Sequence, residues 1–175
     1  MSLSQPQYQV VATPQYTPEV GLFVAMLEHC RESVLDCVRD LTPEQLNYQH
    51  DEEANPIGAL LAHMAAIEWF YTVVSIEGKQ PLPHEWGEWG AHLRLSSAAW
   101  AAAKDQPVEQ HVERLRRVRE RTLSGLAQKD DAWLLRTFSL HWTPEPANNR
   151  WALYHLLEDE FNHRGQIRWL KSRLP

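Results

Sequence analysis

The sequence predicts an all-α protein, an antiparallel four-helix bundle with long connections between its helices. Four segments carry apolar residues at spacings of three and four, the pattern of one buried helix face. Glycine is scarce, at seven residues among 175, and neither Asn-Gly nor Asp-Gly occurs. The usual β-hairpin signal is therefore missing, which argues against an all-β fold.

One bundle domain accounts for nearly the whole length. The chain has 175 residues, 43% of them hydrophobic, and a core of this size needs no disulfide to hold it. Residues 1–16 are polar and aperiodic, so we expect a flexible or strand-like N-terminal arm there. Residues 17–175 then form the bundle domain.

The first helix is predicted over residues 18–40. The run Thr17-Pro18-Glu19 supplies an N-cap hydroxyl, a proline in the first turn and an acid at the positive end of the helix dipole. A second start signal lies at residues 42–45, where Thr and Gln are placed for a capping box. We expect only a short turn there, because the residues that follow are polar.

The second helix is predicted over residues 57–76, after Asn55-Pro56. It is apolar nearly all round, which is typical of a buried helix. Residues 78–106 then contain prolines, glycines and tryptophans, and we expect a loop with a partial helix over residues 91–104.

The third helix is predicted over residues 107–128 and the fourth over residues 150–172. Between them, residues 130–149 form a second long connection. Connections of this length are often functional, and in a bundle the residues of a site project inward from facing helices.

Charge gives no reason to expect nucleic acid or an anionic membrane as a partner. The formal net charge is −6, a modest value that favours solubility. Five arginines cluster within residues 114–121, but glutamates are interleaved with them. We interpret the cluster as a solvated helix face.

The sequence also favours a cytoplasmic location. The N-terminus has neither a basic start nor an apolar run, and the longest apolar stretch, residues 57–67, is too short to span a membrane. Cys30 and Cys37 lie two turns apart on one predicted helix, too far for a disulfide.

The chemistry is concentrated on the fourth predicted helix. His155, Asp159 and His163 are spaced four and four, so they form one polar stripe. Asp159 and His163 can grip one ion together, whereas His155 is too far along the helix to share it. The alternative is an Asp–His hydrogen bond in the core, because a lone buried charge is costly.

The second predicted helix supplies a further ligand, His63, which stands among apolar residues. A histidine in such surroundings is also found as a hydrogen-bonded core residue. With Asp159 and His163 it completes a set of two histidines and one carboxylate. Three protein ligands leave positions open for water or substrate, as in catalytic metal sites.

Two motifs resemble the DinB/YfiT-like superfamily. The run His63-Met-Ala-Ala-Ile-Glu-Trp69 is similar to its first metal motif, and Asp159-Glu-Phe-Asn-His-Arg-Gly-Gln-Ile167 to its second. In the second motif a ligand is followed four residues later by the His of His-Arg-Gly-Gln. The stretches 41–46 and 54–61 also resemble the family's approach to its second helix, and the likeness covers roughly residues 18–172.

The resemblance implies a four-helix bundle of unusual connectivity that binds zinc, nickel or a similar divalent ion, often as a homodimer. It places the first ligand on His63 and the last on His163. Most DinB relatives have a histidine where this chain has Asp159. A carboxylate there is similar to the thiol-dependent maleylpyruvate isomerase branch. Characterised members are thiol-dependent S-transferases and isomerases that use mycothiol, bacillithiol or glutathione.

Other residues of the motifs have expected roles beside the ion. Glu68 is a candidate general base near metal-bound water, or it orients a histidine; its alternative is an exposed partner of a basic side chain. Gln166 is expected to fix a histidine ring. Arg164 is expected to pair with a carboxylate on a neighbouring helix. His155 lines the pocket above the ion or makes a core hydrogen bond.

Tryptophans in the long connections are candidates for the walls of a substrate cleft. Trp86, Trp89 and Trp142 occupy those connections. The alternative is that they pack the bundle, as the other tryptophans do.

Together these observations lead to three functional hypotheses. The first is a metal-dependent enzyme acting on a small molecule, a transferase of low-molecular-weight thiols or a hydrolase. The second is a non-catalytic stress-response or interaction protein that the metal stabilises. The third is a metal-free bundle with an internal His–Asp pair.

Overall fold

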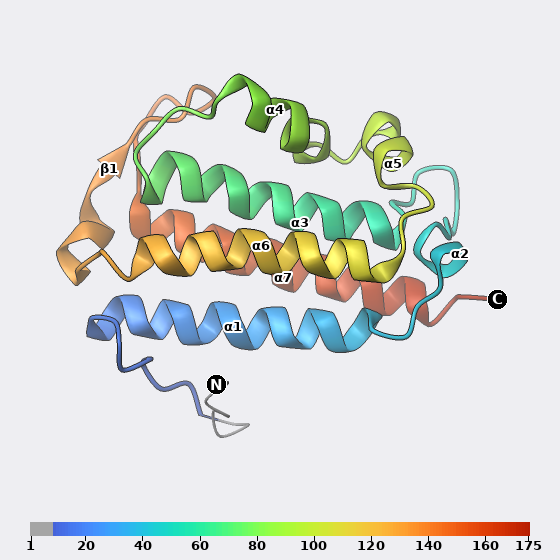
Figure 1. Cartoon of the computed structure of the whole chain (residues 1–175), viewed down its shortest axis with the longest axis horizontal. Helices are drawn as coiled ribbons and strands as arrows, with labels where there is room; N and C mark the ends of the chain where they lie inside the picture. The colour runs from blue at the N-terminus through green and yellow to red at the C-terminus, as the bar shows by residue number, and fades with distance from the viewer. Residues whose placement is uncertain (1–8) are drawn as a thin grey trace.

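The computed structural model describes residues 9–175, and four long helices form its body (Figure 1). They are α1 (Pro18–Val38), α3 (Ile57–Tyr71), α6 (Val108–Leu126) and α7 (Asn149–Lys171). Helix α3 packs against α6 and α7, and α1 packs chiefly against α7. The all-α four-helix bundle predicted from the sequence is confirmed.

The directions of the helices differ from the expected antiparallel arrangement. In Figure 1, α3 and α6 run from right to left, while α1 and α7 run from left to right. The segment between α3 and α6 returns the chain along the bundle, so α6 starts beside the beginning of α3. A crossover of this length is what such a topology requires.

The start of α1 and the turn that follows it agree with the sequence signals. Thr17 is the N-cap of α1, with Pro18 in its first turn. The predicted short turn is α2 (Pro43–Leu46), where Thr42 and Gln45 form the capping box in both directions. Leu46 is buried and anchors this turn to the core.

Helix α3 is the central element of the core. All of its residues except Ile67 are buried, and Trp69 is fully inaccessible. A π-helical segment, η1 (Thr72–Ile76), continues it, and the chain turns at Gly78, which has a positive φ of 64°. By length and composition Ile57–Ile76 could cross a membrane, but 89% of its apolar window is buried inside the bundle.

The segment between α3 and α6 is more helical than predicted. It contains α4 (Pro83–Trp89), the 3-10 turn η2 (Gly90–Leu93) and α5 (Ser97–Ala103), which lie over α3 (Figure 1). Helix α4 starts because the Glu85 carboxylate accepts the backbone N–H of Leu82 at 2.9 Å. Trp89 stacks on Trp69 at 6.0 Å, and this contact anchors the segment to α3.

The connection between α6 and α7 consists of a 3-10 turn and a small hairpin. The turn is η3 (Asp131–Leu135), and the antiparallel strands are β1 (Thr137–Phe138) and β2 (Ala147–Asn148). Asn148 then caps α7 by accepting the N–H of Trp151 at 2.8 Å.

The N-terminal arm lies partly outside the described residues, and its predicted flexibility stays a prediction. Residues 9–16 are described, and the end of this stretch contacts α1. The N–H of Thr13 donates to the carbonyl of Gly21 at 3.2 Å. A Cβ on Gly21 would lie 2.9 Å from the Thr13 carbonyl oxygen, so this close approach requires glycine.

Four ionised side chains are buried where the four helices meet, and we call them the ion quartet: Arg31, Glu68, Arg119 and Glu160. Each is at most 5% exposed. Glu68 contacts Arg31 and Arg119 at 2.6 Å, and Glu160 contacts them at 2.5 and 2.7 Å. The sequence interpretation of the arginine cluster as a solvated face was therefore wrong for Arg119, because its guanidinium is neutralised in the core.

Candidate metal centre

Three side chains converge between the middle of α3 and the second half of α7. Asp159 Oδ1 lies 3.5 Å from His63 Nε2 and 3.2 Å from His163 Nε2. The two imidazole rings are 5.0 Å apart and nearly perpendicular. One donor atom from each residue lies within 4.8 Å of the other two, so the predicted set is brought together.

The spacing of these atoms fits one metal ion. Two ligand atoms that each bind a tetrahedral ion at about 2.1 Å lie about 3.4 Å apart. The separations of 3.5 and 3.2 Å from Asp159 to the two histidines bracket this value, and all three ligand atoms lie within 4.8 Å of one another. The side chains of His63 and Asp159 are 11% exposed and that of His163 is 6% exposed, so little bulk water competes for the site.

Each histidine is oriented by a carbonyl oxygen behind it. His63 Nδ1 lies 2.8 Å from the backbone oxygen of His92, and His163 Nδ1 lies 2.9 Å from Gln166 Oε1. These oxygens only accept hydrogen bonds, so each Nδ1 carries the proton. In the neutral rings each Nε2 then offers its lone pair to the shared space.

The electrostatics of the site favour a cation. With both Nε2 atoms unprotonated, three electron-rich atoms face one another, and either a metal ion or added protons must separate them. Burial raises the pKa of Asp159, but hydrogen bonds and charge from His163 and His63 outweigh it and hold that pKa below its usual range. Asp159 in turn raises the pKa of His163 despite burial.

Gln166 and Arg164 flank the last ligand on α7. Gln166 makes the contact that the sequence analysis assigned to it, with the ring of His163. Arg164 donates to Ser33 Oγ on α1 at 2.6 Å and lies over the ring of Phe161. Its partner is thus a hydroxyl and not the carboxylate that we expected.

Glu68 requires a correction. Its carboxylate belongs to the ion quartet, where it accepts from Arg31 and Arg119. Burial raises its pKa, but the two guanidinium groups lower it to about 2. A carboxylate held so firmly in its ionised form has little basicity, so we do not retain Glu68 as a general base. Nor is it the exposed ion-pair partner of the alternative interpretation, because it is buried.

The ring contacts of His155, Trp86 and Trp142 are with residues outside the candidate ligand set. His155 stacks on Trp151 at 5.0 Å and contacts Glu158 at 3.2 Å. Trp86 packs on Trp69, and Trp142 packs on Phe70. Trp86 and Trp142 are 42% and 50% exposed.

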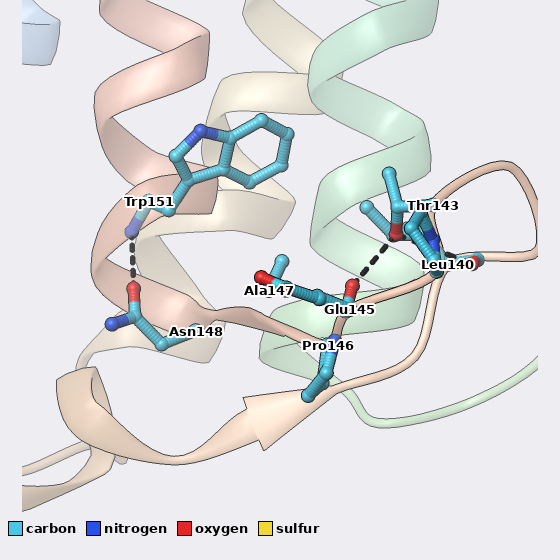
Figure 2. A pocket seen from close by; sticks show the side chains of 8 residues that line it. Leu140, Thr143, Glu145, Pro146, Ala147, Asn148 and Trp151 are labelled. Atoms are coloured by element: carbon cyan, nitrogen blue, oxygen red, sulfur yellow. Dashed lines mark hydrogen bonds between the residues drawn. The ribbon is translucent and has the colours of Figure 1, made fainter.

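A cavity of about 500 Å³ opens where the hairpin meets α7 (Figure 2). Its lining comprises Leu140, Thr143, Pro144, Glu145, Pro146, Ala147, Asn148 and Trp151. Neither the three candidate ligands nor the tryptophans named from the sequence line it. Its aromatic wall is Trp151, which the sequence analysis did not single out.

Two buried histidines near the centre were not anticipated. His92 on η2 and His111 on α6 are 5% and 1% exposed, and His92 Nδ1 and His111 Nε2 have no hydrogen-bond partner within residues 9–175. Burial, then the charge of Arg114, lowers the pKa of His111 to about 4. The sequence carries no signal for the contact between His63 and the His92 backbone.

Comparisons with known proteins agree with this architecture. The model of a family described as Mycothiol-S-transferase matches residues 22–174. Among solved structures, the chain is similar to one described as the crystal structure of the conserved protein of locus from Enterococcus faecalis. The TM-score is 0.66 at 19% identity, over 85% of this chain and 92% of that chain. At this identity the likeness shows a shared fold. No curated protein matches.

Proposed function

The chain belongs to the mycothiol-S-transferase family, a DinB-like family, and on this premise we propose that it is a metal-dependent thiol S-transferase. The proposed reaction joins a low-molecular-weight thiol, mycothiol by family, to an electrophilic small molecule. The observation that carries the proposal is the convergence of His63, Asp159 and His163 at separations of 3.2 and 3.5 Å.

These three residues would hold one divalent ion, for which we propose Zn²⁺ or Ni²⁺. When bound, the ion acts as a Lewis acid and lowers the pKa of a sulfhydryl group. Asp159 supplies one negative charge, and the carbonyl oxygens behind His63 and His163 keep both rings in the ligating tautomer. His63 and His163 are buried and the side chain of Asp159 is 11% exposed, so little bulk water competes for the site.

We further propose that the enzyme is a cytoplasmic homodimer. Support comes from the outer face of α7, where Tyr154, Phe161 and Trp169 are between 44% and 52% exposed. They follow one another at intervals of seven and eight residues, so they form one apolar stripe along the helix. Sedimentation analysis of wild type and Phe161→Glu tests the dimer; a wild-type monomer contradicts it.

Metal content of untagged protein is the primary test. We expect about one ion per chain by mass spectrometry, and loss of that ion in Asp159→Asn, which keeps the shape of the side chain and removes its charge. His50→Ala is the matched control, because His50 is an exposed histidine whose contacts are with the ring of Trp169 and the hydroxyl of Tyr48. The absence of metal from the wild type would remove the chemical basis of the proposal.

Turnover is the second test. Loss of mycothiol thiol in the presence of benzyl chloride is measured against the uncatalysed rate, with and without a chelator, and with His163→Ala. We expect both treatments to abolish the enzymatic part. If the ion is bound but no transfer occurs, and chelation lowers the melting temperature, the ion is a structural link between α3 and α7.

A further inference from the structure

The cavity beside the N-terminus of α7 has the chemistry of a site for an uncharged, largely apolar group. Leu140, the two prolines, Ala147 and the indole of Trp151 supply apolar surface. Its lining contains one acid, Glu145, and no lysine, arginine or histidine. Without a cationic side chain in the lining, a phosphate or carboxylate finds no ion-pair partner there, and an uncharged ligand fits better.

The walls of this cavity are held in place before any ligand arrives. Strands β1 and β2 pair Phe138 with Ala147 at its base. Thr143 Oγ1 donates to the Glu145 carbonyl at 2.8 Å, as drawn in Figure 2. Pro144 and Pro146 fix two further φ angles. A preformed wall reduces the entropic cost of ordering the protein when a ligand binds.

An aromatic pathway runs from the cavity towards the candidate metal centre. Trp151 stacks on His155 at an interplanar angle of 5°, and Tyr71 lies edge-on to both rings, at 5.9 and 5.3 Å. Burial and the nearby negative charge of Asp159 raise the pKa of Tyr71 to about 12, so Tyr71 is close enough to Asp159 to interact with its charge. Eight residues of helix, about 12 Å of rise, separate Trp151 from Asp159.

The volume of the cavity indicates the size of its ligand. A cavity of about 150 Å³ holds benzene, and this one measures about 500 Å³. A fused two-ring group therefore fits, and the lining residue Trp151 lies on α7, the helix that also carries Asp159 and His163.

From these observations we propose that the cavity binds the neutral aromatic part of the electrophilic co-substrate, with Trp151 as the residue that determines this preference. The identity of the ligand as co-substrate rests on the proposed function; its binding in the cavity does not. In the transfer step the thiol sulfur forms a C–S bond to the electrophilic carbon while the carbon–chlorine bond breaks. Chloride leaves with the electron pair, and the thiol proton passes to solvent.

Binding of a non-reactive probe tests the cavity by itself. Isothermal titration with 1-naphthalenemethanol is compared in wild type, Trp151→Ala and Trp169→Ala, all without thiol. Trp169 is the matched control, because it lies on the same helix, is 44% exposed against 37% for Trp151, and is remote from the cavity. We expect the Kd to rise about tenfold in Trp151→Ala and to stay unchanged in Trp169→Ala.

A second variant keeps the proposal testable if Trp151→Ala does not fold. Ala147→Leu fills the cavity from β2 and should weaken the probe without removing an aromatic ring. Equal affinity in wild type, Trp151→Ala and Ala147→Leu overturns the proposal, as does an equal loss in Trp169→Ala. Circular dichroism verifies that each variant is folded.

Selectivity between two chlorides then links the cavity to turnover. The kcat/KM with mycothiol is measured for 1-(10-chlorodecyl)naphthalene, whose chain of ten methylenes spans the roughly 12 Å of helix between Trp151 and Asp159. It is compared with 1-chlorodecane, which has the same chain and leaving group and no ring. Trp151→Ala should lower the ratio of the two values about tenfold. Transfer with an unchanged ratio overturns the cavity proposal while the proposed function stands. Probe binding without transfer to either chloride refutes the function and leaves the cavity as a binding site.

Discussion

Replacing Glu160 by glutamine should strongly destabilise the protein. The substitution keeps the shape of the side chain and removes one of the two negative charges of the ion quartet. Glu160 Oε1 accepts from both Arg31 and Arg119, at 2.5 and 2.7 Å. In Glu160→Gln two buried guanidinium groups would keep only one buried carboxylate, that of Glu68, beside the half-exposed Glu28 that contacts Arg119 at 3.0 Å.

The magnitude follows from the burial of the quartet. Its side chains are between 2% and 6% exposed, so the surplus positive charge is not screened by water. Removing one partner of a buried ion pair costs about 3–5 kcal/mol. In a domain of this size that corresponds to a fall of roughly 6–20 °C in melting temperature.

Urea unfolding followed by far-ultraviolet circular dichroism measures the change. Glu120→Gln is the matched control, since Glu120 pairs with Arg116 on the surface and its side chain is 61% exposed; it should leave the unfolding curve unchanged. Arg31→Met combined with Glu160→Gln restores neutrality and should recover part of the loss. If Glu160→Gln unfolds within about 1 kcal/mol of wild type, the quartet does not stabilise the bundle as argued.

Two further predictions concern the candidate metal centre and its surroundings. Gln166→Leu should weaken metal affinity about 10–100-fold in a chelator competition assay, because His163 loses the oxygen that orients its ring; unchanged affinity would show that this contact does not support the centre. Stability should fall as the pH drops from about 6.5 to 4, because the unfolded chain binds a proton at His111 that the native state, with a pKa of about 4, does not. The loss is about 3 kcal/mol by that difference in pKa, and His111→Gln should flatten the pH profile of urea unfolding across this range.

The four long helices could be predicted from local signals. Caps and apolar periodicity fix where a helix begins and which face it buries, and both are written in consecutive residues. Predicted and observed ends of α1, α3 with η1, α6 and α7 agree within two residues. The direction of α6 was missed, because it depends on the path of the intervening chain.

Segment 83–93 shows where composition misleads. Gly87 and Gly90 indicated a loop, yet the Glu85 cap and the packing of Trp89 on Trp69 stabilise α4 and η2. Tertiary contacts outweigh the cost of glycine in a short helix.

The three candidate ligands could also be predicted from the sequence. The hydrogen bonds that orient their side chains could not all be predicted. Spacing placed Asp159 and His163 on one face, and an apolar helix isolated His63. The oxygen behind His63 belongs to the backbone of His92, and a backbone carbonyl has no sequence signature. The burial of Arg119 could not be predicted either, because neighbouring residues on α6 form ion pairs on the surface.

The bond between His63 and the His92 carbonyl joins the candidate centre to the segment that lies over α3. His92 belongs to η2, so opening that cover would release the ring of His63 from the orientation that ligation requires. The two processes are thermodynamically linked. A change that displaces this segment from α3 lowers the metal affinity, and a bound ion stabilises the segment in its position over α3. Hydrogen exchange of the backbone amides in segment 83–103 should therefore slow when metal is added, although no residue of this segment belongs to the candidate ligand set.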